Sequence, residues 1–416
     1  MASSVLVTQA QSRGGLTVVR SLGQKGIRVV AADEKLLALG FFSRYCSRRL
    51  VCPDPVRSPD AYARFVLDEL AQHDYDVVVP SLDHSLMPLA RRKPEVEQLT
   101  RFPYLGYELL RYGRDKALTV EVARRCGIRV PATFVVHGPA DAERALKDYP
   151  LPLIVRPRES CGSHGLHRVE RADDLWPTCQ TVQSEFGPAI IQEYVPWGGL
   201  TYDVDVLMNR DSEARAVFVA KRIRTYPPLA GPTSCGTGVV YPDLVGMALA
   251  LLKEMRWYGP AEVEFRIDPR DGQPTLMEVN PRLWGSQFTA MVSGVDFPYL
   301  LYRLAMDGDI APVMTYRTDM KARYFFIHDI LCLLFHPRKR SIARSWLRDF
   351  LDPRTKMFLP SWRDPLLLPG RFLTGAVHGT GPARLKELLG NGISQMRWSA
   401  AADSVAKSGS PVSSGK

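Results

Sequence analysis

Short apolar runs alternate with segments of helical periodicity at the beginning of the chain. Val5–Thr8 and Ile27–Ala32 have the apolar, β-branched composition of buried strands. The segment 16–22 between them carries its apolar residues at helical spacing, and a helix around 59–73 and a strand at 76–80 continue the pattern. Strand, helix and strand at this pitch form a βαβ unit with parallel strands, so we expect a Rossmann-like domain here.

The loop after the first strand differs from a dinucleotide-binding loop. It holds only Gly14 and Gly15, whereas a G-x-G-x-x-G sequence lets the backbone approach a pyrophosphate. We therefore expect no NAD site and favour a structural domain that lends its loops to a neighbouring site.

The middle of the chain is predicted to contain a glycine-bearing hairpin. Leu153–Pro157 has the composition of a buried strand, 158–165 is a loop of small residues, and Leu166–Val169 is a returning strand. A further strand, in which valines and aspartates alternate, is expected at 201–208. The loop at 158–165 would form the flexible tip of this hairpin.

The strongest candidate for chemistry is a pair of strands late in the chain. The segment 261–268 alternates as a strand, turn residues follow, and 275–280 forms the partner strand. Glu278 and Asn280 share one face, and the hairpin would set Glu264 close to Glu278. These oxygens suit Mg²⁺, which takes one or two carboxylates and completes its shell with water and phosphate oxygens. The alternative is a solvated hairpin face, on which alternating charge is common.

Other segments add to this candidate site. Arg156 ends an apolar strand before a Gly/Ser loop, an arrangement that suits phosphate binding by a guanidinium and backbone N–H groups. Residues 192–195 end a strand where an adenine can form backbone hydrogen bonds, and 221–224 supply more positive charge. Each segment alone is unspecific, and Arg156 has the alternative role of an ordinary charge at the end of a strand.

In this order and spacing the elements resemble the ATP-grasp superfamily, in its carboxylate–amine ligase and carbamoyl-phosphate-synthetase-like branch. The most specific match is an acidic residue, a second one fourteen positions later and an Asn two beyond it, here Glu264, Glu278 and Asn280. The other matching segments are Arg114-Asp115-Lys116, Ile154–Pro157, Ser160–Gly165, Ile191–Val195, Asp203-Val-Asp205 and Asn280-Pro-Arg282. The resemblance covers about residues 1–310 and leaves out the C-terminal region.

The resemblance implies the fold class α/β and α+β, with a Rossmann-like pre-ATP-grasp domain, a two-subdomain ATP-grasp fold and a basic C-terminal extension. The expected segments are 1–110 for the first domain, 111–315 for the ATP-grasp domain, with a mobile lid at about 130–195, 316–398 for the basic region and 399–416 for a disordered tail. ATP would lie between the lid and the other subdomain.

The resemblance also implies roles for individual residues. The ATP phosphates would be contacted by Lys116 and Arg156, under a loop that includes Ser160, Gly162, Ser163 and Gly165. Adenine would be held by the segment Gln192, Glu193, Tyr194 and Val195. One Mg²⁺ would be shared by Glu264 and Glu278 and a second by Glu278 and Asn280, with Mn²⁺ as a substitute. Arg282 would face the transferred phosphoryl group, and Arg222 and Arg224 would meet a carboxylate substrate.

Two positions depart from the family pattern. Thr201 stands where many members have a Glu that holds the ribose hydroxyls, so that contact is left open. Arg156 stands where many members have Lys, although Arg also occurs there in carbamoyl-phosphate-synthetase-like members. The three metal residues are all present, which argues against an inactive relative.

The net charge of +10 is concentrated at the C-terminal end. Residues 316–416 hold 17 basic and 7 acidic side chains, whereas the preceding part of the chain is balanced. A nucleic-acid-binding role for the whole protein is therefore not expected. Residues 327–350 form a basic amphipathic segment, which would either pack on the core or contact an anionic membrane or an acidic carrier.

The expected function is an ATP- and Mg²⁺-dependent ligase that activates a carboxylate as an acyl phosphate for attack by an amine. Its substrates would be small molecules or a precursor. Many members of the family that it resembles form homodimers, and the sequence leaves the oligomeric state open. The alternatives are a ligase with another acceptor and a non-catalytic nucleotide-binding or scaffold protein of the same fold. We find no secretory signal, no run of ~18–20 apolar residues and no metal-ligand spacing among the 7 cysteines, so we expect a cytoplasmic protein, with peripheral membrane contact as a hypothesis.

Overall fold

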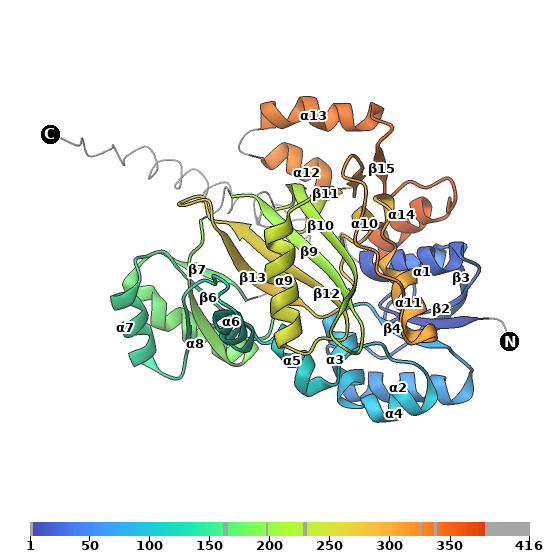
Figure 1. Cartoon of the computed structure of the whole chain (residues 1–416), viewed down its shortest axis with the longest axis horizontal. Coiled ribbons are helices and arrows are strands. Elements are labelled where there is room, and N and C mark those ends of the chain that lie inside the picture. Colours follow the sequence, from blue (N-terminus) through green and yellow to red (C-terminus); the bar gives the residue numbers. More distant parts are fainter. Residues whose placement is uncertain are drawn as a thin grey trace.

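The computed structural model contains three sheets with helices around them (Figure 1). It describes residues 3–160, 165–196, 199–227, 231–324, 327–336 and 339–378. The predicted tail over 399–416 and the loop residues Gly162 and Ser163 lie outside the described residues. One sheet is parallel and the other two are mainly antiparallel, which confirms the predicted α/β and α+β fold class.

The N-terminal sheet is parallel and has the strand order β3-β2-β1-β4. Its strands are β1 (Ser4–Thr8), β2 (Arg28–Asp33), β3 (Cys46–Val51) and β4 (Val77–Pro80). The helices of this part are α1 (Arg13–Gln24), α2 (Pro59–Gln72), α3 (Asp83–Arg91) and α4 (Lys93–Leu99), with a short 3₁₀ helix at Leu39–Phe42. The predicted βαβ unit is confirmed. Because β1 and β4 are parallel neighbours, the loops that follow them leave the sheet at the same edge.

A second sheet, of antiparallel order β5-β8-β6-β7, forms the lobe at the lower left of Figure 1. Its elements are β5 (Thr133–Val135), α7 (Pro139–Asp148), β6 (Leu153–Pro157), β7 (His167–Val169), α8 (Leu175–Phe186) and β8 (Ala189–Glu193), with a short 3₁₀ helix at Ala172–Asp174. The predicted hairpin is confirmed as the β6–β7 pair. We call this part, residues 133–193, the lid lobe after the predicted lid. Buried residues such as Val155, Cys179 and Ile191 give it a hydrophobic core separate from that of the other two sheets.

The central sheet has seven strands in the order β13-β12-β9-β10-β11-β14-β15, antiparallel except for the last pair. The strands are β9 (Thr201–Met208), β10 (Ala214–Thr225), β11 (Thr233–Gly238), β12 (Gly259–Ile267), β13 (Pro274–Asn280), β14 (Lys321–Arg323) and β15 (Thr355–Met357). The helices that accompany it are α5 (Tyr107–Arg114), α6 (Lys116–Arg125), α9 (Pro242–Glu254), α10 (Phe288–Val292) and α11 (Phe297–Asp307). The predicted strand at 201–208 is confirmed as β9.

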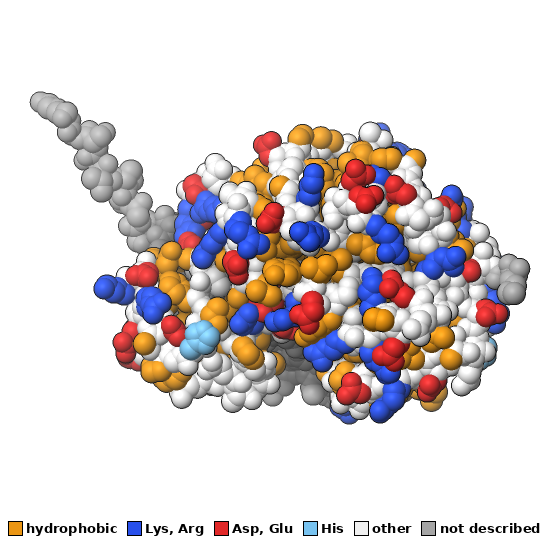
Figure 2. Space-filling view, turned by 60° about the horizontal axis from the view of Figure 1, so that its bottom comes forward, with side chains coloured by type: hydrophobic (Ala, Val, Ile, Leu, Met, Phe, Trp, Pro, Cys, Tyr) orange, Lys and Arg blue, Asp and Glu red, His pale blue; other side chains and the backbone are white. Residues whose placement is uncertain are grey.

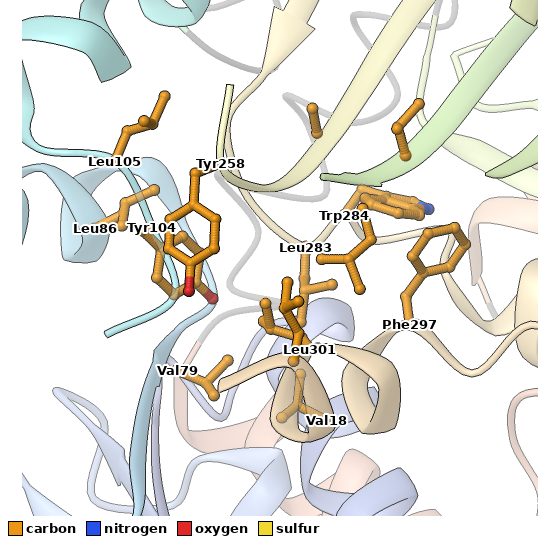
Figure 3. Packing of buried hydrophobic residues seen from close by; sticks show 14 of the residues in the cluster. Val18, Val79, Leu86, Tyr104, Leu105, Tyr258, Leu283, Trp284, Phe297 and Leu301 are labelled. Carbon is orange, nitrogen blue, oxygen red and sulfur yellow. The ribbon is translucent and has the colours of Figure 1, made fainter. Parts of the chain in front are cut away.

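One hydrophobic core joins the N-terminal sheet to the central sheet. Val18 of α1 and Val79 of β4 belong to the same buried cluster as Leu283, Trp284 and Phe297 (Figure 3). The rings of Trp284 and Phe297 meet edge to face at 4.8 Å, and Trp284 is fully buried. These two parts of the chain are therefore held together by shared packing, whereas the lid lobe has a separate core.

The surface shows where the lid lobe meets the rest of the molecule. Figure 2 shows a notch between the lid lobe and the lobe built on the N-terminal sheet. Acidic and basic side chains are interspersed over this face. The candidate site residues come from α6 and the β12–β13 hairpin and, in the lid lobe, from β6 and β8.

The C-terminal helices are α12 (Ile327–Phe335), α13 (Lys339–Leu351) and α14 (Leu367–His378). Leu331 and Cys332 of α12 pack against Tyr226, so the apolar side of this predicted amphipathic segment faces the core. In the part of the chain that the structure describes, no helix is long and apolar enough to cross a membrane.

A buried network of ion pairs attaches these helices to the central sheet. Arg224 of β10 pairs with Asp329 at 3.1 Å and with Asp349 at 2.7 Å, and Arg323 pairs with Asp329 at 2.6 Å. All four side chains are at most 3% exposed. The expectation that Arg224 meets a substrate is therefore wrong, because its charge is neutralised inside the protein by two carboxylates far along the chain.

Candidate functional site

The β12–β13 hairpin brings the predicted metal residues together. Glu264 lies directly opposite Glu278, and Glu262 lies opposite Asn280. The predicted proximity of Glu264 and Glu278 is thereby confirmed. The Asn280 amide donates a hydrogen bond of 2.9 Å to Glu262, a carboxylate that the sequence did not single out although it lies two residues from Glu264 on the same face.

The donor chemistry of the hairpin fits a hard divalent cation. Glu264 and Glu278 are 12% and 21% exposed, so both carboxylates are largely shielded from water. Across the described ranges, no group of three or more His, Cys, Asp and Glu side chains could hold a metal ion by itself. A Mg²⁺ ion here would take its protein ligands from these two carboxylates and the amide oxygen of Asn280, and its other ligands from water and phosphate.

Arg222 of β10 bridges Glu264 of this pair and a neighbouring carboxylate, Asp203. It donates to both oxygens of Asp203 on β9, at 2.9 and 2.6 Å, and it also donates to Glu264. Burial alone lowers the pKa of Arg222, but the charges of Asp203 and Glu264 raise it well above its ordinary value. Arg222 therefore stays charged and fixes the orientation of Glu264.

Two cations lie on the other side of Glu278. The guanidinium of Arg156 on β6 lies 3.4 Å from its carboxylate, and Lys116 at the start of α6 donates to the Ser160 carbonyl at 2.7 Å. Burial, with Arg156 nearby, lowers the pKa of Lys116 to about 7. Although burial opposes ionisation of Glu278, Lys116 and Arg156 hold its pKa below the ordinary value. The lid strand thus contributes a cation that faces a carboxylate of the hairpin.

The N-terminal part contributes a carboxylate that the sequence did not reveal. Asp83, the first residue of α3, accepts a hydrogen bond of 3.0 Å from Nε of Arg282 and lies 3.5 Å from Arg114. Asp83 is 1% exposed, and although burial raises its pKa, the two arginines lower it below the ordinary value. A signal was available, because Asp83 follows the carboxyl end of parallel strand β4, where ligand sites of α/β sheets gather.

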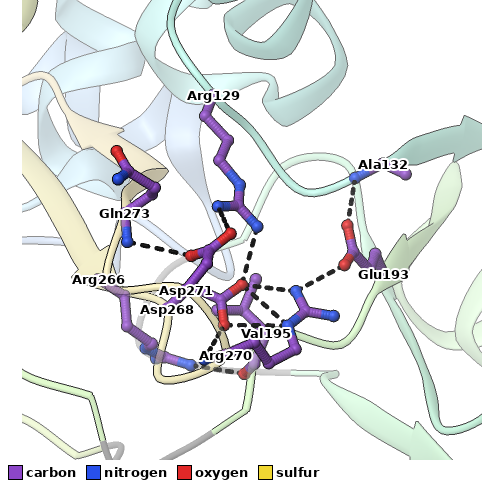
Figure 4. Close-up of polar contacts among 9 residues, drawn as sticks. All are labelled: Arg129, Ala132, Glu193, Val195, Arg266, Asp268, Arg270, Asp271 and Gln273. Carbon is purple, nitrogen blue, oxygen red and sulfur yellow. Dashed lines mark hydrogen bonds and ion pairs between the residues drawn. The ribbon is translucent and has the colours of Figure 1, made fainter. Parts of the chain in front are cut away.

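The predicted adenine segment lies where the lid lobe joins the central sheet (Figure 4). Glu193 accepts from Arg270 at 2.7 Å, and the Val195 carbonyl accepts from Arg266 at 3.4 Å. Gln192 is buried and donates to the Thr133 hydroxyl within the lid sheet. The ring of Tyr194 lies 4.7 Å from the guanidinium of Arg168.

A second set of ion pairs supports the same junction. Asp268, in the turn between β12 and β13, accepts hydrogen bonds from both Arg129 and Arg270 (Figure 4). Because Arg270 also binds Glu193, this turn connects the end of β8 to the hairpin that carries Glu264 and Glu278.

The loop after β6 is described in part. The Lys116 ammonium lies close to both the carbonyl and the hydroxyl of Ser160, at 2.7 and 3.4 Å. Gly165 has φ of +68°, and a Cβ there would lie 2.8 Å from Pro157, so a larger residue does not fit. Gly162 and Ser163 lie outside the described residues.

Comparison with known proteins agrees with this geometry. Residues 185–325 match the family described as ATP-grasp in the biosynthetic pathway with Ter operon. The chain is 22% identical over 295 residues to the carbamoyl phosphate synthase large chain of Pseudarthrobacter chlorophenolicus, which covers 67% of this chain and 26% of the relative. It is 29% identical over 225 residues to the D-alanine–D-alanine ligase of Anaeromyxobacter sp. (strain K), and the match covers 50% of this chain and 71% of that ligase.

Solved structures show the same fold. A biotin carboxylase from Campylobacter jejuni, solved as a β,γ-ATP complex, superposes with a TM-score of 0.63 at 17% identity, over 77% of this chain and 74% of that one. The N5-carboxyaminoimidazole synthetase of Staphylococcus aureus superposes with a TM-score of 0.60 at 16% identity, over 77% of this chain and 80% of that one.

The sequence relatives and the fold point to one superfamily. The chain spans about a quarter of the length of the carbamoyl phosphate synthase chains that it matches. The match to the ATP-grasp family covers β9 to β14, which include the hairpin with Glu264, Glu278 and Asn280. The chain is similar to the ATP-grasp superfamily, in the branch of the carboxylate–amine ligases and carbamoyl phosphate synthase, which confirms the resemblance found in the sequence.

Proposed function

We propose that the protein is an ATP- and Mg²⁺-dependent ligase that activates a carboxylate as an acyl phosphate for attack by an amine. The observation that carries this proposal is the pairing of Glu264 with Glu278 on one hairpin, with Lys116 and Arg156 beside Glu278. Two carboxylates next to two cations suit a metal-bound phosphate chain, because the cations neutralise phosphate oxygens that the metal leaves free.

Each predicted residue has a role in this proposal. The phosphates of ATP would be bound by Lys116, Arg156 and the loop that contains Ser160, Gly162, Ser163 and Gly165. Adenine would be bound by the segment Gln192, Glu193, Tyr194 and Val195. Mg²⁺ would be held by Glu264, Glu278 and Asn280, and it would neutralise phosphate charge. The transferred phosphoryl group and the substrate carboxylate would be faced by Arg282 and Arg222.

The contacts of these residues favour a preorganised site. Arg222 is fixed by Asp203 and Glu264, and Arg282 is fixed by Asp83, so neither guanidinium has to be ordered when charge develops on the transferred phosphoryl group. Arg156 comes from the lid lobe, whereas Glu278 comes from the central sheet. Binding a nucleotide between them would draw the two lobes together and exclude water, which would otherwise hydrolyse an acyl phosphate.

A phosphate-release screen tests this function. The full chain is incubated with MgATP and pairs of small acids, amino acids and amines, with Glu278→Gln as the inactive control. Phosphate and ADP release that needs both an acid and an amine, and that is lost in Glu278→Gln, is the expected result. MgADP binding without turnover for any pair would favour the alternative of a non-catalytic nucleotide-binding protein. Turnover that survives in Glu278→Gln would contradict the metal assignment.

A second proposal concerns the exposed side of the C-terminal helices, for which we propose contact with an anionic membrane. Leu347 and Leu351 are 61% and 87% exposed on α13, on the same face as Arg344 and Arg348. Trp362 is 99% exposed. Apolar side chains next to arginines are typical of surfaces that bind anionic lipid.

Flotation with vesicles that contain phosphatidylserine tests this contact. The Leu351→Ser and Trp362→Ser double variant should lose binding, whereas Val240→Ser, a matched variant at another exposed apolar side chain, should retain it. Equal flotation of both variants would contradict the proposal. Light scattering on the same samples decides whether this surface instead forms a homodimer.

A further inference from the structure

Arg13 lies where three parts of the chain meet. It is the first residue of α1, in the loop after β1, and its Nη1 donates a hydrogen bond of 2.7 Å to the Thr233 carbonyl of β11. Its guanidinium carbon lies 4.9 Å from the ring centre of Tyr324, which directly follows β14. A Cβ at position 285 would lie 3.7 to 3.8 Å from Nε and Nη2, so the backbone of Gly285 runs close to that side of the guanidinium.

Within the part of the chain that the structure describes, no carboxylate forms an ion pair with the Arg13 guanidinium. None of the ion pairs among the described residues includes Arg13. Burial lowers its pKa, and the positive charges of Arg371 and Arg222 lower it further, whereas Tyr324 and Glu262 raise it. The oxygens of Glu262 already accept hydrogen bonds from Asn280 and Ser286. A shielded cation with cations around it is a site for an anion.

The loop that carries Arg13 is held rigidly. Gln287 is fully buried, and its Nε2 donates a hydrogen bond of 2.9 Å to the Gly14 carbonyl. A Cβ at Gly14 would lie 3.5 Å from the carbonyl oxygens of Ser81 and Trp284, which shows how closely this peptide is enclosed. The other amide atom of Gln287, Oε1, is buried and has no partner among the described residues. The backbone next to Arg13 is therefore held in place by buried contacts.

The position of Arg13 relates it to the carboxylate hairpin. Its charge interacts with Glu262 and Arg222, and these residues border the pair of Glu264 and Glu278. The guanidinium thus acts on residues that border the place where the proposed function puts the reacting groups, whereas Lys116 and Arg156 contact Ser160 and Glu278. A group bound by Arg13 would come from a substrate other than the nucleotide.

We infer that Arg13 binds the carboxylate of a small acid or amino acid, which is a substrate of the ligase. The inference rests on the proposed function and names its substrate class. A carboxylate fits because the planar guanidinium can donate two parallel hydrogen bonds to it. The carboxylate has two possible sources, the acid that is activated and an amine acceptor that is itself an amino acid.

Saturation-transfer NMR on the full chain tests this inference. The probes are the proteinogenic amino acids and short mono- and dicarboxylic acids, each added in the presence of MgADP. At least one probe should bind to the wild type and to Arg28→Gln, a matched variant at an exposed arginine of the same domain. Arg13→Gln should raise the Kd of that probe by about 10- to 100-fold, the size of a lost charge-assisted hydrogen bond. Arg13→Lys keeps the positive charge but lacks the two parallel donors of a guanidinium, so it should raise the Kd of the probe less than Arg13→Gln does.

The outcomes separate this inference from the proposed function. If MgADP does not bind to the wild type, the proposed function fails. If MgADP binds but no probe does, or if a probe binds equally well to Arg13→Gln, only the role of Arg13 is overturned. If Arg13→Gln does not fold, as judged by its thermal transition, Arg13→Lys decides: an unchanged Kd overturns the inference and a raised one supports it. A bound acid that alone elicits phosphate release from MgATP is the donor, and one that acts only with a second acid is the acceptor.

Discussion

Asp83 provides a test of how the N-terminal part serves the site. Its carboxylate accepts a hydrogen bond from Arg282 and forms an ion pair with Arg114. The side chains of Arg282 and Arg114 are 12% and 16% exposed, and that of Asp83 is 1% exposed. Asp83→Asn retains the size of the side chain and removes the negative charge. Two shielded arginines are then left facing an amide, and Arg282 is no longer held in one orientation.

The magnitude follows from the burial of these groups. Breaking a buried ion pair by removing one partner costs about 3 to 5 kcal/mol. Both arginines keep some access to water and the amide oxygen still accepts one hydrogen bond, so we expect a loss of about 2 to 3 kcal/mol in the free energy of unfolding. A misplaced Arg282 should lower kcat by about 10- to 100-fold, because about 1.4 kcal/mol of lost transition-state stabilisation is tenfold in rate.

The assay separates positioning from general damage. Chemical denaturation gives the unfolding free energy, and phosphate release gives kcat and the KM for ATP. The KM should change by less than about threefold because Lys116 and Arg156 are untouched. Asp60→Asn, at an exposed position in the first turn of α2, is the matched control and should behave as wild type. A fully active Asp83→Asn enzyme, or a variant whose KM for ATP rises while kcat is unchanged, would refute this account of Arg282.

Three further predictions concern charge at other points of the fold. In the free protein the pKa of Lys116 is lowered from 10.5 to about 7, and a bound phosphate should raise it again, so MgADP binding at pH 8 should take up a proton. Calorimetry in buffers of different ionisation enthalpy measures this, and equal uptake in Lys116→Met would contradict it. Arg224→Met should lose about 3 kcal/mol of unfolding free energy in guanidinium denaturation while MgADP affinity is retained, because Asp329 and Asp349 each lose one of their cationic partners in the core and keep only Arg323 and Lys321; stability equal to wild type would be evidence against this. Arg270→Ala should weaken MgADP binding by no more than about fivefold, because the half-exposed pair with Glu193 contributes at most about 1 kcal/mol; a loss above tenfold would show that the junction is essential.

The β12–β13 hairpin with its carboxylates was predictable because residues close together in the sequence determine it. Strand alternation and turn residues between 261 and 280 fix which side chains share a face, and the antiparallel register then places Glu264 opposite Glu278. The β6–β7 hairpin and the parallel N-terminal sheet were predicted for the same reason, since each depends on a short run of neighbouring residues.

The remainder of the site depends on contacts between distant segments. Arg224 looked equivalent to Arg222 in the sequence, two residues apart on one strand, yet Arg222 pairs with Asp203 and Arg224 pairs with Asp329 and Asp349. Asp83 and Arg13 reach the site only because the loops after β1 and β4 pack against the central sheet. The helical spacing of Trp284 and Phe288 in the sequence fits either a cleft wall or core packing, and the contact of Trp284 with Phe297 assigns it to the core. The domain boundaries at 110 and 315 stay a prediction.

Binding of Mn²⁺ in place of Mg²⁺ tests the central claim most directly. Electron paramagnetic resonance of free Mn²⁺, in the presence of a non-hydrolysable ATP analogue, measures the affinity for the metal without requiring a known substrate. Glu264→Gln and Glu278→Gln should each raise the Kd for Mn²⁺ by at least about tenfold, the usual size of a lost or misplaced ligand. Glu108→Gln, at an 81% exposed side chain, should leave it unchanged. Equal Mn²⁺ affinity in all four proteins would contradict the proposal that this hairpin holds the metal.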